Sequence, residues 1–85
     1  MNEYKFMCEI SFPRFDRKID VAIPVNKTVY YVMTMLVQLI NDDFSKDYKP
    51  TGQEILVDQD LGITYDKNIL VKESQIKNGS KLVFY

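Results

Sequence analysis

The last ten residues read Ile76-Lys-Asn-Gly-Ser-Lys-Leu-Val-Phe-Tyr85. Asn78-Gly79 is typical of a turn, because both residue types tolerate positive φ. In residues 81–85 the apolar side chains Leu82 and Phe84 recur at every second position, which is the period of a β-strand. We therefore expect a tight turn and a final strand that ends with the chain, with no Gly-Gly tail behind it.

The N-terminal part has the same alternation twice. Residues 4–12 place apolar side chains on one face, and Pro13 ends the run because it cannot donate to a ladder. Residues 18–25 alternate again, with Pro24 near the end. A loop of about five residues between the two runs predicts an antiparallel hairpin.

An apolar segment follows the hairpin. Asn26 or Thr28 can cap a helix, which we expect to run from Val29 to Asp42 or Asp43. At 100° per residue its apolar side chains point in one general direction. These are Val29, Val32, Met33, Leu36, Leu39 and Ile40. A buried strand remains the alternative, because periodicity blurs in so apolar a run.

Short elements make up the second half of the chain. Residues 45–52 are polar and contain Pro50 and Gly52, which predicts a loop. Residues 55–57 and 63–65 predict two brief strands before the final one. We expect one domain, residues 1–85, of α+β class, with a mixed sheet of about four to five strands and one main helix on one face.

Composition excludes several classes of function. The net charge is −1 and the basic residues are scattered, so no nucleic-acid partner is expected. The most apolar run, residues 29–40, is shorter than the roughly 20 residues that span a bilayer, so no direct membrane insertion is expected. The content of hydrophobic residues is 46%, which leaves apolar surface for a protein partner.

The chain offers little for catalysis. It has no histidine, and its single cysteine, Cys8, falls on the apolar face of its predicted strand, where packing is expected. Asp58-Gln-Asp-Leu-Gly62 departs from the spacing of a calcium loop, so we interpret it as an ordinary turn. We expect no catalytic residue, no metal, no cofactor and no enzymatic activity.

The order of the predicted elements resembles the β-grasp fold of ubiquitin. Val71, Ile76, Leu82 and Phe84 fall at the spacing of late core residues in ubiquitin, and Ser80 precedes the final strand as a serine does there. In ubiquitin the first, last and third strands of the sheet are neighbours, and their outer face binds partners.

The chain resembles the YukD/EsaB family more closely. These are small ubiquitin-like proteins of type VII (WXG100-exporting) secretion systems in Gram-positive bacteria. The matching positions are residues 19–25 before the helix, Leu70, Ile76, Asn78-Gly79 and residues 82–84. The chain departs from the family in its longer loop, residues 45–53, and in its aromatic end at Tyr85.

The resemblance implies a non-conjugating accessory protein that acts by binding in the cytoplasm, at the inner face of the membrane through its partners. Those partners would be the membrane-bound secretion ATPase and associated components, and a homodimer stays open. One alternative is a generic β-grasp interaction module unrelated to secretion. The other is a ubiquitin-type modifier or sulfur carrier, which the missing Gly-Gly tail disfavours.

Three apolar surfaces are candidates for protein binding. The first is the outer sheet face, where alternation predicts that Met7, Val83 and Tyr85 point outward, and that Leu56 does so if Ile55 and Val57 point to the core. With the first, last and third strands as neighbours, we expect Met7, Val83 and Leu56 to lie side by side. The second is one flank of the helix, for which packing under the loop is the simpler interpretation, and the third is the hairpin tip. The residues are Met7, Leu56, Val83 and Tyr85 on the sheet, Tyr30 and Val37 on the helix, and Phe15 at the tip.

Overall fold

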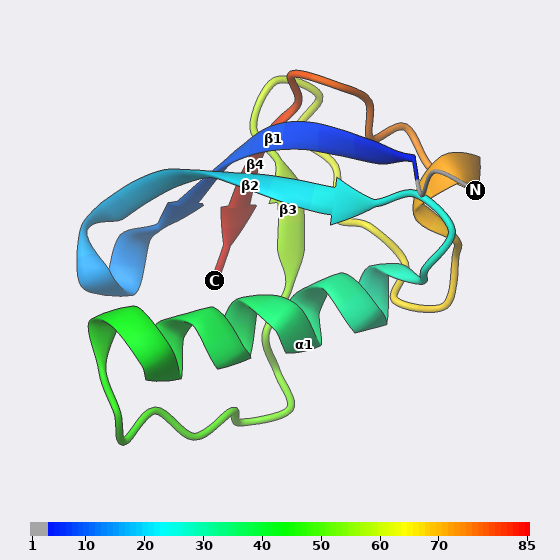
Figure 1. Cartoon of the computed structure of the whole chain (residues 1–85). Helices are drawn as coiled ribbons and strands as arrows, with labels where there is room; N and C mark the ends of the chain where they lie inside the picture. Colours follow the sequence, from blue (N-terminus) through cyan, green and yellow to red (C-terminus); the bar gives the residue numbers. More distant parts are fainter. Residues whose placement is uncertain (1–3) are drawn as a thin grey trace.

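A computed structural model describes residues 4–85, so the first three residues of the predicted domain lie outside the described part (Figure 1). The strands are β1 (Lys5–Phe12), β2 (Arg17–Pro24), β3 (Leu56–Asp58) and β4 (Lys81–Phe84). The main helix is α1 (Val29–Leu39), and three short helical segments are Pro13–Phe15, Ile40–Phe44 and Val71–Glu73.

The four strands form one mixed sheet in the order β2-β1-β4-β3. The β1–β2 and β3–β4 pairs are antiparallel, whereas β1 and β4 are parallel. Figure 1 shows α1 lying across one face of this sheet. The predicted α+β architecture, with a terminal hairpin and a final strand beside β1, is confirmed.

The segment after the hairpin is a helix, so the alternative of a buried strand is wrong. Thr28 provides the cap, because its side-chain oxygen accepts a 3.1 Å hydrogen bond from the Tyr31 backbone N–H. Helical structure continues beyond Leu39 as a wider π-helical segment through Phe44, slightly past the expected end. The buried face of α1 includes Val32 and Leu36, as the spacing predicts.

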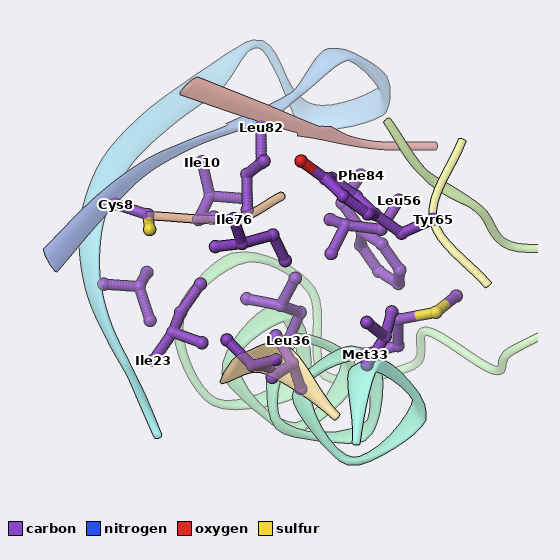
Figure 2. Close-up of a cluster of buried hydrophobic side chains, with 14 of the residues drawn as sticks. Cys8, Ile10, Ile23, Met33, Leu36, Leu56, Tyr65, Ile76, Leu82 and Phe84 are labelled. Atoms are coloured by element: carbon purple, nitrogen blue, oxygen red, sulfur yellow. The ribbon is translucent and has the colours of Figure 1, made fainter. Parts of the chain in front are cut away.

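The core lies between the helix and the sheet. Figure 2 shows Ile10, Leu82 and Phe84 of the central strands pointing toward Leu36 and Met33 of α1. All these side chains are buried, which is the main favourable contribution to folding in a domain this small. The predicted turn is also present, with Gly79 at a φ of 90°.

Two predictions for the second half need correction. The third strand begins at Leu56 rather than Ile55 and ends at Asp58. The expected strand at residues 63–65 is reduced to a single bridge between Thr64 and Val57. Within residues 4–85, every helix is too short or too polar to cross a membrane.

Candidate protein-binding surface

Four apolar side chains gather on the outer face of the sheet, the face opposite α1. Val57 pairs with Val83 across β3 and β4, and the Tyr85 N–H donates a 3.0 Å hydrogen bond to the Ile55 carbonyl. The neighbouring residues Leu56, Leu82 and Phe84 are buried on the inner face, so Ile55, Val57, Val83 and Tyr85 point outward. We call these four residues the outer-face patch.

The outer-face patch is most accessible at the end formed by Ile55 and Tyr85. Ile55 is 38% exposed and Tyr85 is 55% exposed, while Val57 and Val83 are half-buried. Directly opposed side chains in an antiparallel pair lie about 5 Å apart, so the four groups form a contiguous surface. A tyrosine at its edge supplies apolar area and a polar tip, a combination enriched at interfaces.

Leu56 does not belong to this surface, so its predicted outward position is wrong. It is 0% exposed and pairs with Phe84 in the core (Figure 2). Because the strand period is two, a shift of one residue exchanges the two faces. Ile55 and Val57, which were expected to face the core, therefore take the outer positions.

Met7 is exposed but lies away from the outer-face patch. It is 52% exposed and pairs with Ala22 on β2, whereas the residue of β1 beside Val83 is Ser11. Four residues of strand separate Met7 from Ser11, which is about 13 Å. The expectation that Met7 lies beside Val83 is therefore wrong, although its predicted exposure is confirmed.

The helix flank forms one wall of a groove. Tyr30 is 61% exposed, and Val37 is half-buried against the core. Together with Pro50 and Gly52 of the loop, they line a cavity of about 470 Å³ that also reaches Lys67. Val37 packs against the core at the wall of this groove, and Tyr30 is exposed beside it.

Phe15 at the hairpin tip takes part in internal packing. Its ring centroid lies 5.9 Å from that of Phe44 and 5.8 Å from that of Tyr48. Arg14 lies over Tyr48 and Arg17 over Phe44, at 5.5 and 4.9 Å from the ring centroids. The tip is therefore attached to the end of the helical segment, and the half-buried Phe15 offers little surface to a partner.

A buried glutamate organises the loop that leads into the outer-face patch. Glu54 accepts hydrogen bonds from the Tyr48 hydroxyl at 2.8 Å, the Thr51 N–H at 2.7 Å and the Gly52 N–H at 3.0 Å. Burial alone would raise the pKa of Glu54, but these hydrogen bonds outweigh it and lower the pKa to about 2. The ionised carboxylate therefore fixes the conformation of the loop that precedes Ile55.

The candidate chemical groups have structural roles. Cys8 is buried, its thiol donates to the Lys77 carbonyl at 3.5 Å, and burial raises its pKa to about 11. Asp58 accepts from the backbone N–H groups of Asp60 and Leu61, each at 3.0 Å, which makes this segment the predicted turn. Across residues 4–85 there is no group of three or more side chains suited to hold a metal ion.

Ile55 and Val57 are the residues that sequence reasoning missed. In the alternation of a strand, Glu54 and Asp58 fall on the same face as Leu56. Two polar residues on that face favour the prediction that Leu56 points to solvent. The structure buries both carboxylates with hydrogen-bond partners, so polarity was a misleading signal here. The alternation of the final strand did identify Val83 and Tyr85 as outward.

Comparison with known proteins gives similarity in fold alone. No protein-family model matches the sequence, and no curated protein matches it. Solved structures do match. A chain of the MycP5-free ESX-5 inner membrane complex superposes with a TM-score of 0.77 at 16% identity, over 95% of this chain and 20% of that one.

Two further solved structures match over most of both chains. The EccD5 ubiquitin-like domain from Mycobacterium xenopi has a TM-score of 0.76 at 16% identity, covering 96% of this chain and 93% of the other. The ubiquitin-like domain of the Arabidopsis thaliana protein At2g32350 has a TM-score of 0.69 at 18% identity, covering 95% and 76%. The fold is therefore the ubiquitin-like β-grasp, as the resemblance implies.

Proposed function

We propose that this chain is a non-conjugating, ubiquitin-like accessory protein of a bacterial type VII secretion system, of the YukD/EsaB kind. The observation that carries the proposal is the likeness in fold to the EccD5 ubiquitin-like domain and to a chain of the ESX-5 inner membrane complex. The sequence positions shared with the YukD/EsaB family support the same assignment. Its place would be the cytoplasm, at the inner face of the membrane.

The proposed mechanism is noncovalent binding through the outer-face patch. Val57 and Val83 supply an apolar centre, and Ile55 and Tyr85 add exposed area at the edge. Burial of such side chains against a partner is favourable by about 25 cal/mol per Å² of apolar surface. The expected partners are the secretion ATPase and the membrane components associated with it.

A binding role without catalysis is part of the proposal. The lone thiol is buried with a raised pKa, so the thiolate that a nucleophile requires is disfavoured. The carboxylates of Glu54 and Asp58 are occupied by internal hydrogen bonds. Neither feature supports an enzymatic step.

The test is recovery of partners by tagged full-length protein from detergent-solubilised native membranes. We compare the wild type with Ile55→Glu and Tyr85→Glu, which place a charge in the outer-face patch at exposed positions. Tyr30→Glu is the matched control for Tyr85→Glu, because Tyr30 is also an exposed tyrosine, at 61% against 55%, but lies on the helix flank. All variants are first checked for an unchanged circular dichroism spectrum.

Recovery of the secretion ATPase with wild type and Tyr30→Glu, and its loss with the two patch variants, supports the proposal. Loss with Tyr30→Glu alone moves the binding site to the groove and contradicts the patch. Recovery of proteins unrelated to secretion contradicts the secretion assignment and favours the generic interaction module. An isopeptide or thiocarboxylate adduct in the intact mass would instead support a modifier or sulfur carrier.

A further inference from the structure

The strand β2 forms one margin of the sheet and pairs only with β1 among the described strands. The Val25 N–H donates to the Tyr4 carbonyl at 3.2 Å, and the β1–β2 register continues from this pair without a break. In an antiparallel ladder, hydrogen-bonded residues alternate with residues whose N–H and C=O groups point the other way. The odd-numbered residues of β2 therefore bond to β1.

The even-numbered residues present their backbone groups at the open edge. These are Lys18, Asp20 and Ala22, and within residues 4–85 no group bonds to their N–H or C=O. Pro24 has the same phase but carries no N–H. The edge is longer than that of β3 and contains exposed positions at Lys18 and Asp20. An unpaired edge of this kind is a template for another strand.

The charges along this edge lack a complete set of partners. Asp20 lies directly opposite Glu9 in a non-hydrogen-bonded pair, where side chains are closest. Lys18 reaches Glu9 at 3.8 Å, but no cation of the described residues lies within ion-pair distance of the Asp20 carboxylate. Like charges directly opposite are destabilising, so a cation supplied from outside would relieve Asp20.

A second β2 strand supplies such a cation in one register. When two β2 edges meet antiparallel, with even-numbered residues bonding, Lys18 can oppose Asp20 of the other copy, and Asp20 opposes Lys18. Registers on either side place Asp20 against Asp20 or Lys18 against Lys18, which repel. A further shift places Pro24 opposite Lys18, where one hydrogen bond is missing.

The geometry points to a second copy of this chain as the partner of the β2 edge. The two copies join through antiparallel β2 strands, with a two-fold axis between the Ile19 residues and two Lys18–Asp20 pairs beside it. The interface is isologous, as expected of a symmetric dimer. This inference goes beyond the proposed function, because it concerns self-association on a margin remote from the outer-face patch.

The helix α1 also places apolar side chains on the flank that points toward the β2 edge. The flank of α1 that carries Tyr30 and Val37 faces the loop and Phe84, toward β3 and β4. At 100° per residue the opposite flank, which points toward β2, carries Tyr31 and Met35. Tyr31 is exposed and Met35 is half-buried. Since both helices lie on one side of the joined sheets, these flanks face each other across the axis.

The first test is a charge-swap series measured by sedimentation equilibrium over a wide concentration range. The wild type should form a dimer of twice its 10.0 kDa mass. Asp20→Lys places a lysine opposite Lys18 of the other copy at both positions of the interface. This repulsion should raise the dissociation constant about tenfold. The double variant Lys18→Asp/Asp20→Lys restores opposite charges and should return the constant to within about threefold of the wild type.

A wild type that stays monomeric up to about 1 mM overturns the inference. So does a dimer that Asp20→Lys leaves unchanged, or one that the double variant fails to restore. Asp60→Lys, the same change of charge at an exposed position after β3, is the control for net charge and should not affect association.

A second test does not depend on charge. Residues directly opposed in a non-hydrogen-bonded antiparallel pair have Cα atoms about 4.5 Å apart, within the range of a disulfide. Ile19→Cys in a Cys8→Ala background should therefore form a covalent dimer on mild oxidation. Thr34→Cys in the same background should not. Equal cross-linking of both variants, or none with Ile19→Cys, contradicts the register.

Discussion

The Tyr65 hydroxyl donates a 2.7 Å hydrogen bond to Oδ2 of Asp58, and both side chains are buried. Oδ1 of the same carboxylate accepts the N–H groups of Asp60 and Leu61. The aspartate thus ends β3, forms the following turn and binds a residue seven positions further along the chain. Burial raises the pKa of Tyr65, and the hydrogen bond to Asp58 raises it further.

Removal of this carboxylate should destabilise the protein strongly. We expect Asp58→Ala to lower the free energy of unfolding by about 2–3 kcal/mol, because it leaves a buried hydroxyl without an acceptor. Tyr65→Phe should cost about 1–2 kcal/mol, since Asp58 keeps its backbone donors. Urea denaturation measures both, with the exposed Asp60→Ala as the control. A cost for Asp58→Ala no larger than that of the control would contradict this role.

Replacement of Leu56 and replacement of Ile55 by alanine should have different effects on the stability of the protein. Leu56→Ala removes a fully buried side chain and should cost about 2–5 kcal/mol of stability. Ile55→Ala changes an exposed position and should cost under about 1 kcal/mol. Thermal denaturation of the two variants checks the face assignment. The reverse order of stabilities would mean that β3 has the opposite phase.

Glu54 should make stability depend on pH in acid. Its pKa in the folded protein is about 2, below its ordinary value of 4.5, so its contribution is complete above about pH 4.5. The contribution is lost as the pH falls toward 2, because the carboxylate must then be protonated. The wild type should exceed Glu54→Gln in unfolding free energy by about 1–3 kcal/mol at pH 6.

The difference in unfolding free energy between the wild type and Glu54→Gln should become smaller at pH 3 and smaller still at pH 2. Urea denaturation at each pH gives the measurement. Thr51→Ala is a useful companion, because it removes one weaker donor to Glu54, at 3.3 Å, and leaves the Thr51 N–H bond in place. A difference between wild type and Glu54→Gln that is constant from pH 6 to pH 2 would show that Glu54 does not titrate as described.

Cys8 should react slowly with alkylating agents in the folded protein. Burial raises the pKa of its thiol to about 11 and also excludes the reagent. At pH 8 we expect alkylation by iodoacetamide to be at least about 100-fold slower than in guanidinium-unfolded protein. Mass spectrometry over time follows the reaction. Similar rates in the two states would show that the thiol is accessible.

Much of the fold could be predicted from local patterns. The hairpin, the buried face of the helix and the final strand each have a period that their residues repeat over a whole element. The turn at Asn78-Gly79 follows from the backbone freedom of one glycine, whose φ is 90°. The outward positions of Val83 and Tyr85 follow from the same alternation.

The candidate site was only half predictable. The outer-face patch draws two residues from β4, where the period was clear, and two from β3, where three residues of strand are too few to define a period. The separation of Met7 from Val83 depends on the parallel register of β1 and β4, for which the sequence carries no local signal. The sequence alone predicts a surface position for Phe15, because its contacts, Phe44 and Tyr48, lie far along the chain.

The sequence by itself determined the N-terminal hairpin, the helix and the final strand, because periodic burial and turn propensity are encoded by neighbouring residues. Only the tertiary structure decided the phase of β3. Glu54 and Asp58 can face inward solely because Tyr48, Thr51 and Tyr65 arrive there to satisfy their carboxylates. A buried charge is tolerated where hydrogen bonds replace water, and those partners exist only once the chain has folded.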